Sequence, residues 1–272
     1  MFFILLTLLP LSIIIVFAVL LRNIDQLFER QATHLLGQSP KQMDKIVTHR
    51  NLAHLPEPVQ NYFRHVLKEG LPYISCVRLK HSGKFKTSEH GKWMDITGEE
   101  YFTTADPGLV WKGHTKWFTA YDVFISGQGK LDVYFLSMFR IVNGHGLKYS
   151  QAELLRWLGE SVWFPTNLLP TEFLQWSAID SHSAKLTYTS NKFIVYYIVT
   201  FNDIGEITQL ETKRYMGDKN LETWIGKLSG YASFHGVLIP TKIEAVWRMR
   251  DRDFPYAQFQ ITELEYDKNQ LF

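Results

Sequence analysis

Apolar positions recur along the chain with two periods, one helical and one of two residues. Between Leu55 and Pro72 the period is helical, and from Ile74 onward most apolar positions alternate with polar ones. One set falls at i, i+3, i+4, i+7 and i+8, namely Val59, Tyr62, Phe63, Val66 and Leu67. This spacing predicts an amphipathic helix that ends before Gly70 and Pro72.

The alternating part of the chain predicts antiparallel strands joined by turns. On either side of the turn at residues 127–129 the alternating apolar positions are Tyr121, Val123 and Ile125, then Leu131, Val133 and Phe135. This pattern is typical of a β-hairpin. Residues 193–201 are almost all apolar, which predicts a central strand covered on both faces. Near Thr262 and Glu263 the alternation changes phase, which predicts a β-bulge.

A helical insertion at about residues 150–175 separates two β-rich halves. Ser150 and Glu153 have the spacing of a capping box, so we expect the helix to begin there. The apolar positions continue at helical spacing to about Trp163, and Pro165 then interrupts the pattern. The insertion is therefore predicted to be one helix followed by an irregular segment.

The first segment of the chain, MFFILLTLLPLSIIIVFAVLL, carries no charged side chain. A helix of this length spans about 30 Å, the thickness of a hydrocarbon core. We expect a retained anchor, because no Lys or Arg precedes the apolar run and the run is long for a signal peptide. Val16-Phe17-Ala18 would serve as a cleavage site, so a cleaved signal peptide is the alternative. Arg22 and Arg30 are too few to indicate the side of the membrane.

These elements predict three parts and one fold class. The parts are a transmembrane anchor over residues 1–22, a juxtamembrane helical neck over residues 23–54 and an antiparallel β domain over residues 55–272. The predicted class is mainly β with accessory helices (α+β). We expect a curved antiparallel sheet or half-barrel with helices packed on its concave face, preceded by one transmembrane helix. The predicted localisation is a membrane, with a single-pass N-terminal anchor.

Composition narrows the function classes. Aromatic residues make up 15% of the chain, which fits either an aromatic-rich β core or an apolar ligand cavity. The net charge is +2, from 29 Lys and Arg against 27 Asp and Glu, and no basic run is present, so we expect no nucleic-acid partner. The single cysteine, Cys76, excludes an intrachain disulfide and is interpreted as a small core residue.

No motif for a metal, a cofactor or a nucleophile stands out. The ten His residues lack ligand spacing, so we expect no metal site. Gly127-Gln128-Gly129 is better explained by a hairpin turn than by a phosphate-binding loop, so we expect no cofactor.

The charged residues of the predicted insertion helix form the most suggestive constellation. Glu153, Arg156 and Glu160 share one helix face, and two carboxylates can serve as general acid and base. The alternative is structural, with Glu153 as the cap and Arg156 bridging to Glu160. Glu160 is the one catalytic candidate, because it precedes an aromatic corner. The candidate ligand-pocket residues are Tyr101, Trp111, Arg156, Glu160, Trp163 and Trp247.

Several segments resemble a known family. GEEYF (98–102), DPGLVW (106–111) and ELLRWLGE (153–160) resemble a bacterial, membrane-anchored family catalogued only as a domain of unknown function. The resemblance covers roughly residues 55–265 and brings no known activity. The Pro-Gly-x-x-Trp strand pair is also similar to lipoprotein carriers of the bacterial envelope (LolA/LolB-like). That likeness implies a curved antiparallel sheet with helices closing an apolar cavity.

The sequence favours a membrane-anchored binding module over an enzyme. Its expected partners are the lipid bilayer and an apolar ligand, such as a lipid or an acyl chain. Two alternatives stay open: a hydrolase-like enzyme that uses Glu160, and a structural or assembly protein whose aromatic surface binds a partner chain.

Overall fold

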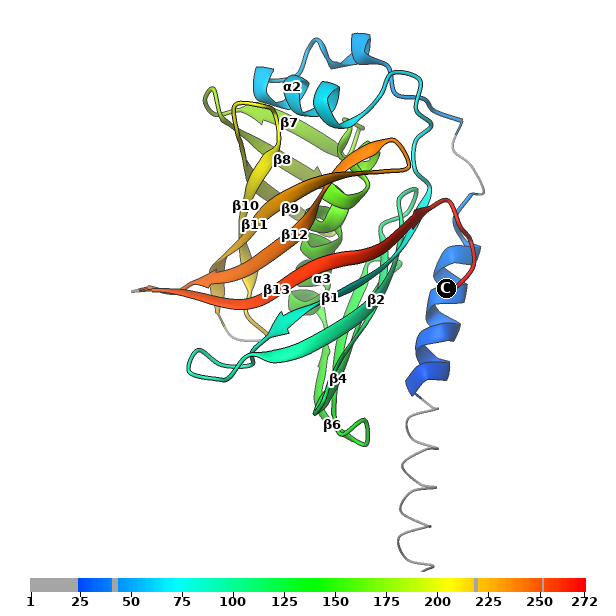
Figure 1. Ribbon diagram of the computed structural model, residues 1–272, viewed down its shortest axis with the longest axis vertical. Coiled ribbons are helices and arrows are strands. Elements are labelled where there is room, and N and C mark those ends of the chain that lie inside the picture. The colour runs from blue at the N-terminus through cyan, green and yellow to red at the C-terminus, as the bar shows by residue number, and fades with distance from the viewer. Residues whose placement is uncertain (1–23, 41–43, 218–219, 251) are drawn as a thin grey trace, which may run out of the picture.

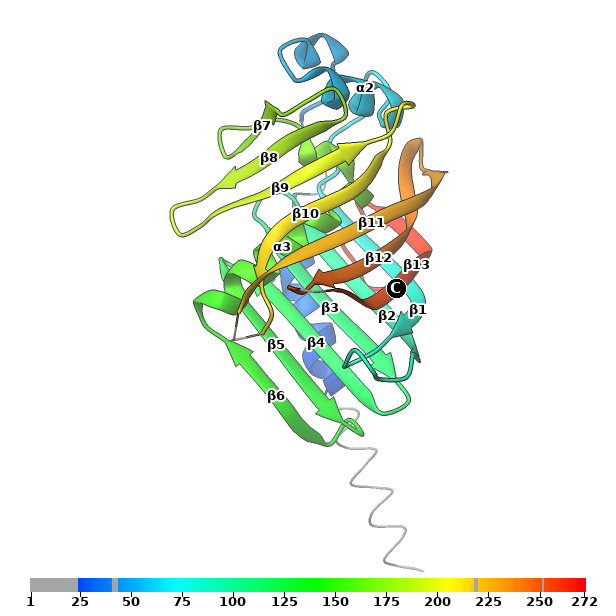
Figure 2. The ribbon, with the colours of Figure 1, turned by 90° about the vertical axis from the view of Figure 1, so that its left-hand side faces the viewer.

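The computed structural model describes residues 24–40, 44–217, 220–250 and 252–272 (Figure 1). Within these residues, thirteen strands form one antiparallel sheet. The sheet is strongly curved, as the two perpendicular views show (Figures 1 and 2). A curved antiparallel sheet is what the sequence predicts for the fold class.

Two β-meanders make up the sheet. The first contains β1 (Cys76–Phe85), β2 (Met94–Thr103), β3 (Gly108–Thr115), β4 (Phe118–Ile125), β5 (Gln128–Phe135) and β6 (Phe139–His145). The second contains β7 (Leu174–Ala178), β8 (Ser183–Thr189), β9 (Ile194–Phe201), β10 (Ile207–Tyr215), β11 (Leu221–Phe234), β12 (Val237–Arg248) and β13 (Asp253–Tyr266). The meanders join where β1 pairs with β13, so the spatial order runs from β6 to β1, then from β13 to β7.

Helices cover both faces of the sheet. After residue 44, the described helices are η1 (His49–Leu52), α2 (Glu57–Val66), α3 (Leu147–Glu160), η2 (Ser161–Trp163) and η3 (Pro165–Leu168). Helix α3 contacts β3 to β6 from the first meander and β9 and β10 from the second, so the sheet curves around it (Figure 2). Helix α2 contacts β8 and β12. The division of the chain near residues 22 and 54 stays a prediction.

Strands β1 to β4 of the first meander are covered on their outer side as well, because residues 24–37 are helical and pack there. This helix, blue in Figure 1, inserts Phe28, Ala32, Leu35 and Leu36 against Cys76, Tyr101, Val110, Tyr121 and Val123. The inner face belongs to a larger core that α2 and α3 complete. Alternate residues of one strand therefore lie in different cores.

Two local predictions are confirmed. The predicted helix around residues 59–67 is α2, and Gly70 beyond it has a φ of +79°. The bulge lies where the sequence places it, since Lys80 pairs with Glu263 while His81 pairs with Ile261. Thr262 is thus the extra residue that changes the phase of β13.

Two other local predictions are wrong. Helix α3 begins at Leu147, three residues before the predicted cap, and Ser150 donates instead to the carbonyl of Gly146. Glu153 is therefore no capping residue. The strand at residues 193–201 is covered fully on one face alone, because Val195, Tyr197, Val199 and Phe201 alternate with partly exposed residues. This strand, β9, lies two strands from the edge at β7, where the second face is only partly covered.

The predicted membrane localisation is corrected. The anchor was placed over residues 1–22, which lie outside the described residues. The finding that corrects it is that no described helix is long and apolar enough to cross a membrane. The helix over residues 24–37 carries charged side chains on one side, among them Asp25, Glu29 and Arg30, and packs its apolar side against the sheet.

Candidate functional site

A cavity of about 670 Å³ lies between α3 and the inner face of the sheet. Its volume is in the range of small-molecule sites, about 300–1,000 Å³. Both meanders supply apolar walls, which include Phe85, Ile96, Trp111, Phe118, Leu131, Val133, Trp224, Ile243, Ala245, Trp247, Phe254, Ala257 and Phe259. Polar side chains gather on the side that α3 forms, so the cavity has an apolar part and a charged end.

Three cross-strand neighbours form the base of the charged end. Glu100 on β2 is paired with Trp111 on β3, and Trp111 is paired with Asp122 on β4. Directly paired residues of antiparallel strands point to the same face. The two carboxylates therefore flank the indole, and the Arg156 guanidinium from α3 lies over it, 4.4 Å from the ring centroid.

Arg156 binds three carboxylates at once. Its Nη2 donates to Glu100 Oε1 at 2.8 Å, its Nη1 to Asp122, and its Nε to Glu160 Oε1 at 3.0 Å. Burial opposes the charge, but the carboxylates of Glu100, Glu160 and Asp122 raise the pKa of Arg156 well above its usual value. Arg156 is therefore a permanent cation, and each of its three guanidinium nitrogens donates to a carboxylate.

A second, looser pair adjoins this network. Arg214 on β10 places Nη2 3.8 Å from Oε1 of Glu153, a side chain that is only 3% exposed. Burial, and then the neighbouring Asp122 carboxylate, raise the pKa of Glu153 to about 8. Three buried atoms of this region have no hydrogen-bond partner: Asp122 Oδ1, Glu153 Oε2 and Arg214 Nε. Polar groups buried without a partner are uncommon and point to a missing ligand or water.

His81 and Trp111 lie flat over strand glycines beside the charged end. A Cβ at Gly98 would lie 2.0 Å from His81 Nε2, and one at Gly113 would lie 2.2 Å from the Trp111 ring. The glycines are thus required for the rings to cross the backbone so closely. Burial, and then Arg156, lower the pKa of His81 to about 3, so its imidazole is neutral.

Four of the six predicted pocket residues line the cavity: Trp111, Arg156, Glu160 and Trp247. The other two, Tyr101 and Trp163, lie elsewhere. Tyr101 is paired with Val110 and faces the outer helix, whereas Trp163 packs against Phe102 in the inner core. Tyr101 and Trp111 lie ten residues apart on paired strands, but the register places their side chains on opposite faces of the sheet.

The sequence patterns point to none of Glu100, Asp122 and Arg214 as site residues, and the capping-box spacing predicts a cap at Glu153. Asp122 lies between Tyr121 and Val123, which the alternation of this hairpin counts as its apolar positions. Both faces of β4 are buried. A useful signal would have been that Asp122 shares its face with Phe124, since a charge on an apolar strand face is unusual.

The chemistry of the site is that of ion pairs and hydrogen bonds. Among the described residues, no group of three or more His, Cys, Asp or Glu side chains has the geometry to hold a metal ion. Both carboxylate oxygens of Glu160, the catalytic candidate, share the single N–H of Arg156 Nε, at 3.0 and 3.2 Å. Glu160 lines the cavity, and its catalytic role stays a prediction.

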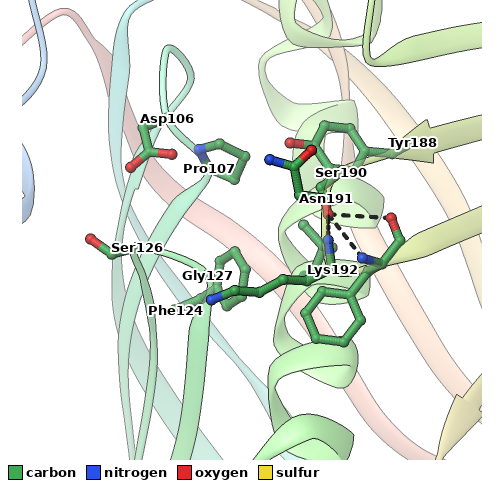
Figure 3. Close-up of a pocket in the computed structure, with 11 residues that line it drawn as sticks. Asp106, Pro107, Phe124, Ser126, Gly127, Tyr188, Ser190, Asn191 and Lys192 are labelled. Carbon is green, nitrogen blue, oxygen red and sulfur yellow. Dashed lines mark hydrogen bonds between the residues drawn. The ribbon is translucent and has the colours of Figure 1, made fainter.

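A smaller pocket of about 210 Å³ lies where turns from the two meanders approach each other. Figure 3 shows Asp106 and Pro107 on one side and Asn191 and Lys192 on the other. The Ser190 hydroxyl accepts hydrogen bonds within its own turn, from the backbone N–H groups of residues 192 and 193. The pocket is therefore a junction between loops, and its volume is about a third of that of the main cavity.

One family model matches most of the chain. The model of a family of unknown function, DUF6544, matches residues 45–259. This match confirms the resemblance to a domain of unknown function. No curated protein matches the chain.

Solved structures similar to the chain include three bacterial proteins. A DUF1329 family protein from Desulfovibrio piger is 10% identical, with 71% of this chain and 86% of that chain covered and a TM-score of 0.42. A putative outer membrane lipoprotein-sorting protein domain from Vibrio parahaemolyticus is 7% identical, with 77% and 91% covered and a TM-score of 0.41. A LolA superfamily protein from Nitrosomonas europaea is 8% identical, with 76% and 91% covered and a TM-score of 0.38. The latter two agree with the carrier-like resemblance, but at these TM-scores the similarity says nothing about a ligand.

Proposed function

We propose that this chain, which belongs to the DUF6544 family of unknown function, binds a ligand with a long apolar chain in the cavity between α3 and the sheet. One observation carries the proposal: the cavity of about 670 Å³ is walled largely by aromatic and aliphatic side chains. A wall of this kind favours an alkyl or acyl chain over a polar metabolite, because burial of each methylene contributes about 0.8 kcal/mol.

The affinity expected from this burial is substantial. A chain of eight to ten methylenes would gain roughly 6–8 kcal/mol before the entropy lost on binding is subtracted. Since a micromolar dissociation constant corresponds to about 8 kcal/mol, the net binding is weaker than micromolar, which suits a reversible binding protein. Affinity should therefore depend steeply on chain length until the cavity is full.

The ligand needs a path into the cavity, and the lining supplies one. Lys86 and Thr87, after β1, and Gly217, after β10, belong to the lining together with Ile141 of edge strand β6. Ile141 is 56% exposed, so the lining is continuous with the surface at this point. We propose that the entrance lies there, between β6 and the lining residues Lys86, Thr87 and Gly217.

Tryptophan fluorescence of the full chain tests the proposal, because Trp111, Trp224 and Trp247 line the cavity. A terminally brominated undecanol should quench the fluorescence in a saturable way. Octanol, decanol and dodecanol should then displace the probe with affinities that rise about tenfold for each two methylenes. Quenching without saturation, or displacement that ignores chain length, would overturn the proposal.

Two variants with the same chemical change provide the control. Ala245→Phe fills the cavity, because Ala245 lies in its wall and is only 7% exposed. It should weaken dodecanol binding at least tenfold while thermal stability is kept. Ala178→Phe adds the same ring on the exposed edge strand β7 and should leave binding within twofold of the wild type. Equal binding by Ala245→Phe and the wild type contradicts the cavity as the binding site.

A further inference from the structure

We propose that the charged end of the cavity binds a protonated primary amino group, so that the ligand is a long-chain amine. This inference rests on the proposed function, and it adds the chemistry of the head group. The apolar walls take the alkyl chain, and the carboxylates beside α3 take the ammonium.

The charges of the site are not balanced by the protein itself. Two guanidiniums, Arg156 and Arg214, face four carboxylates, which belong to Glu100, Asp122, Glu153 and Glu160. Lys86 also lines the cavity, but its ammonium lies over Trp93 and Phe254. A buried excess of negative charge is unstable unless protons or a bound cation compensate it.

Unpaired atoms show where the cation would lie. Asp122 Oδ1 and Glu153 Oε2 are buried acceptors without a donor, and both residues line the cavity. Taken as whole residues, Asp122 is 7% exposed and Glu153 is 2% exposed, so bulk water does not form hydrogen bonds to these oxygens. An ammonium group carries three N–H donors, enough for both oxygens.

Other head groups fit this end of the cavity less well. A carboxylate would add a negative charge to a site where four carboxyl groups face two guanidiniums, and all three guanidinium nitrogens of Arg156 already donate to carboxylates of the protein. A quaternary ammonium has the right charge but no N–H to donate to Asp122 and Glu153. Arg214 Nε is an unpaired donor, so a hydroxyl oxygen next to the amine would complete the contacts.

In the empty site a proton takes the place of the cation. Burial and the Asp122 carboxylate raise the pKa of Glu153 to about 8, so Glu153 is largely protonated at neutral pH. The charged groups that act on Glu153 come from β4, β10 and α3, and are Asp122, Arg214, Arg156 and Glu160. Glu100 on β2 and Tyr197 on β9 act in turn on these neighbours. Binding of an alkylammonium ion then displaces the Glu153 proton to the buffer, so that charge is conserved.

Calorimetry of the full chain tests the inference with four probes of equal chain length: dodecylamine, dodecanol, dodecanoate and dodecyltrimethylammonium. Titrations at pH 7 in two buffers of different ionisation enthalpy measure the protons released. We expect dodecylamine to bind at least tenfold more tightly than dodecanol and to release close to one proton. We expect dodecanol to release none.

The outcomes separate this inference from the proposed function. If dodecanol binds as tightly as dodecylamine, or dodecylamine binds without proton release, the head-group inference fails and the cavity function stands. If none of the four probes gives saturable binding, both fail. Tightest binding of dodecanoate or of dodecyltrimethylammonium also overturns the inference.

A matched pair of variants locates the effect. Glu153→Gln keeps the size of the side chain and removes its ionisation, so the ratio of alcohol to amine dissociation constants should fall to near one and proton release should disappear. Glu263→Gln makes the same change on β13 at a carboxylate that is 56% exposed, and should keep both. An unchanged amine preference in Glu153→Gln contradicts the assigned position.

Discussion

Trp111 Nε1 donates a hydrogen bond of 2.8 Å to His81 Nε2, across the intervening strand β2. The two rings are nearly parallel, with an interplanar angle of 5°. Because Nε2 accepts, the proton of the neutral imidazole is on Nδ1, which has no partner of its own. This bond connects the indole beneath Arg156 to the strand that joins the two meanders.

Trp111→Phe should destabilise the protein. The substitution leaves the buried His81 Nε2 without a donor, and an unsatisfied buried acceptor costs about 1–3 kcal/mol. Urea unfolding followed by circular dichroism measures the loss. Trp117→Phe is the control, since Trp117 is 45% exposed and the same change there should cost less than about 0.5 kcal/mol.

His81 should stay neutral in the folded protein well below the pH at which a free imidazole is protonated. Its pKa is lowered from 6.5 to about 3, first by burial and then by Arg156. The unfolded chain binds this proton below pH 6.5 and the folded chain does not, so stability falls as the pH drops from 6.5 toward 3. Nitrogen NMR should show the Nδ1–H tautomer of His81 at pH 5; a protonated imidazole there contradicts the assignment.

Glu153 should act on stability in the opposite direction. Its pKa rises from 4.5 to about 8 on folding, first through burial and then through Asp122. Between these values the folded state holds a proton that the unfolded state loses, so its contribution to stability is complete below pH 4.5 and declines up to pH 8. Glu153→Gln should reduce the decline of the unfolding free energy between pH 5 and pH 8, measured by urea unfolding, by up to about 1.4 kcal/mol per pH unit. A decline as steep as that of the wild type would refute this.

Arg156→Met should be among the most destabilising substitutions. It leaves Glu100, Asp122 and Glu160 without their shared cation, and removal of one partner from a buried ion pair typically costs about 3–5 kcal/mol. The loss should be smaller at pH 5 than at pH 8, because the remaining carboxylates take up protons. Arg248→Met, at a side chain that is 48% exposed, should cost no more than about 1 kcal/mol at either pH.

Gly129→Ala should loosen α3 from the sheet. A Cβ at Gly129 would lie 2.6 Å from Ser150 Cα and from the Tyr149 carbonyl oxygen, so the helix backbone would have to move. The hydrogen bond from Gly129 N to Ser150 Oγ, 2.9 Å long, would be strained as well. We expect a loss of about 1–3 kcal/mol in unfolding free energy. Gly37→Ala has no atom within 4 Å of its Cβ and should stay within about 0.5 kcal/mol of the wild type.

Features of this protein that depend on neighbours in sequence were predictable. The apolar face of α2 repeats within one stretch of sequence, and the phase change at Thr262 is visible in β13 alone. The cap at Ser150 failed although the motif is local, because the chain enters the helix through Gly146 and uses Ser150 to hold Gly129. The spacing of a motif does not show whether its side chain forms a hydrogen bond to a distant part of the chain instead.

The sequence by itself determined the alternation of the strands, the position of the bulge and the placement of an arginine and two glutamates on one face of α3. The tertiary structure alone decided which strand face looks inward. Register pairs Glu100 with Trp111 and Trp111 with Asp122, and it turns Tyr101 to the other side. Backbone hydrogen bonds form these pairings, and the side chains of the sequence do not reveal which residues will be paired. The charged end of the cavity therefore exists only once the sheet has folded around α3.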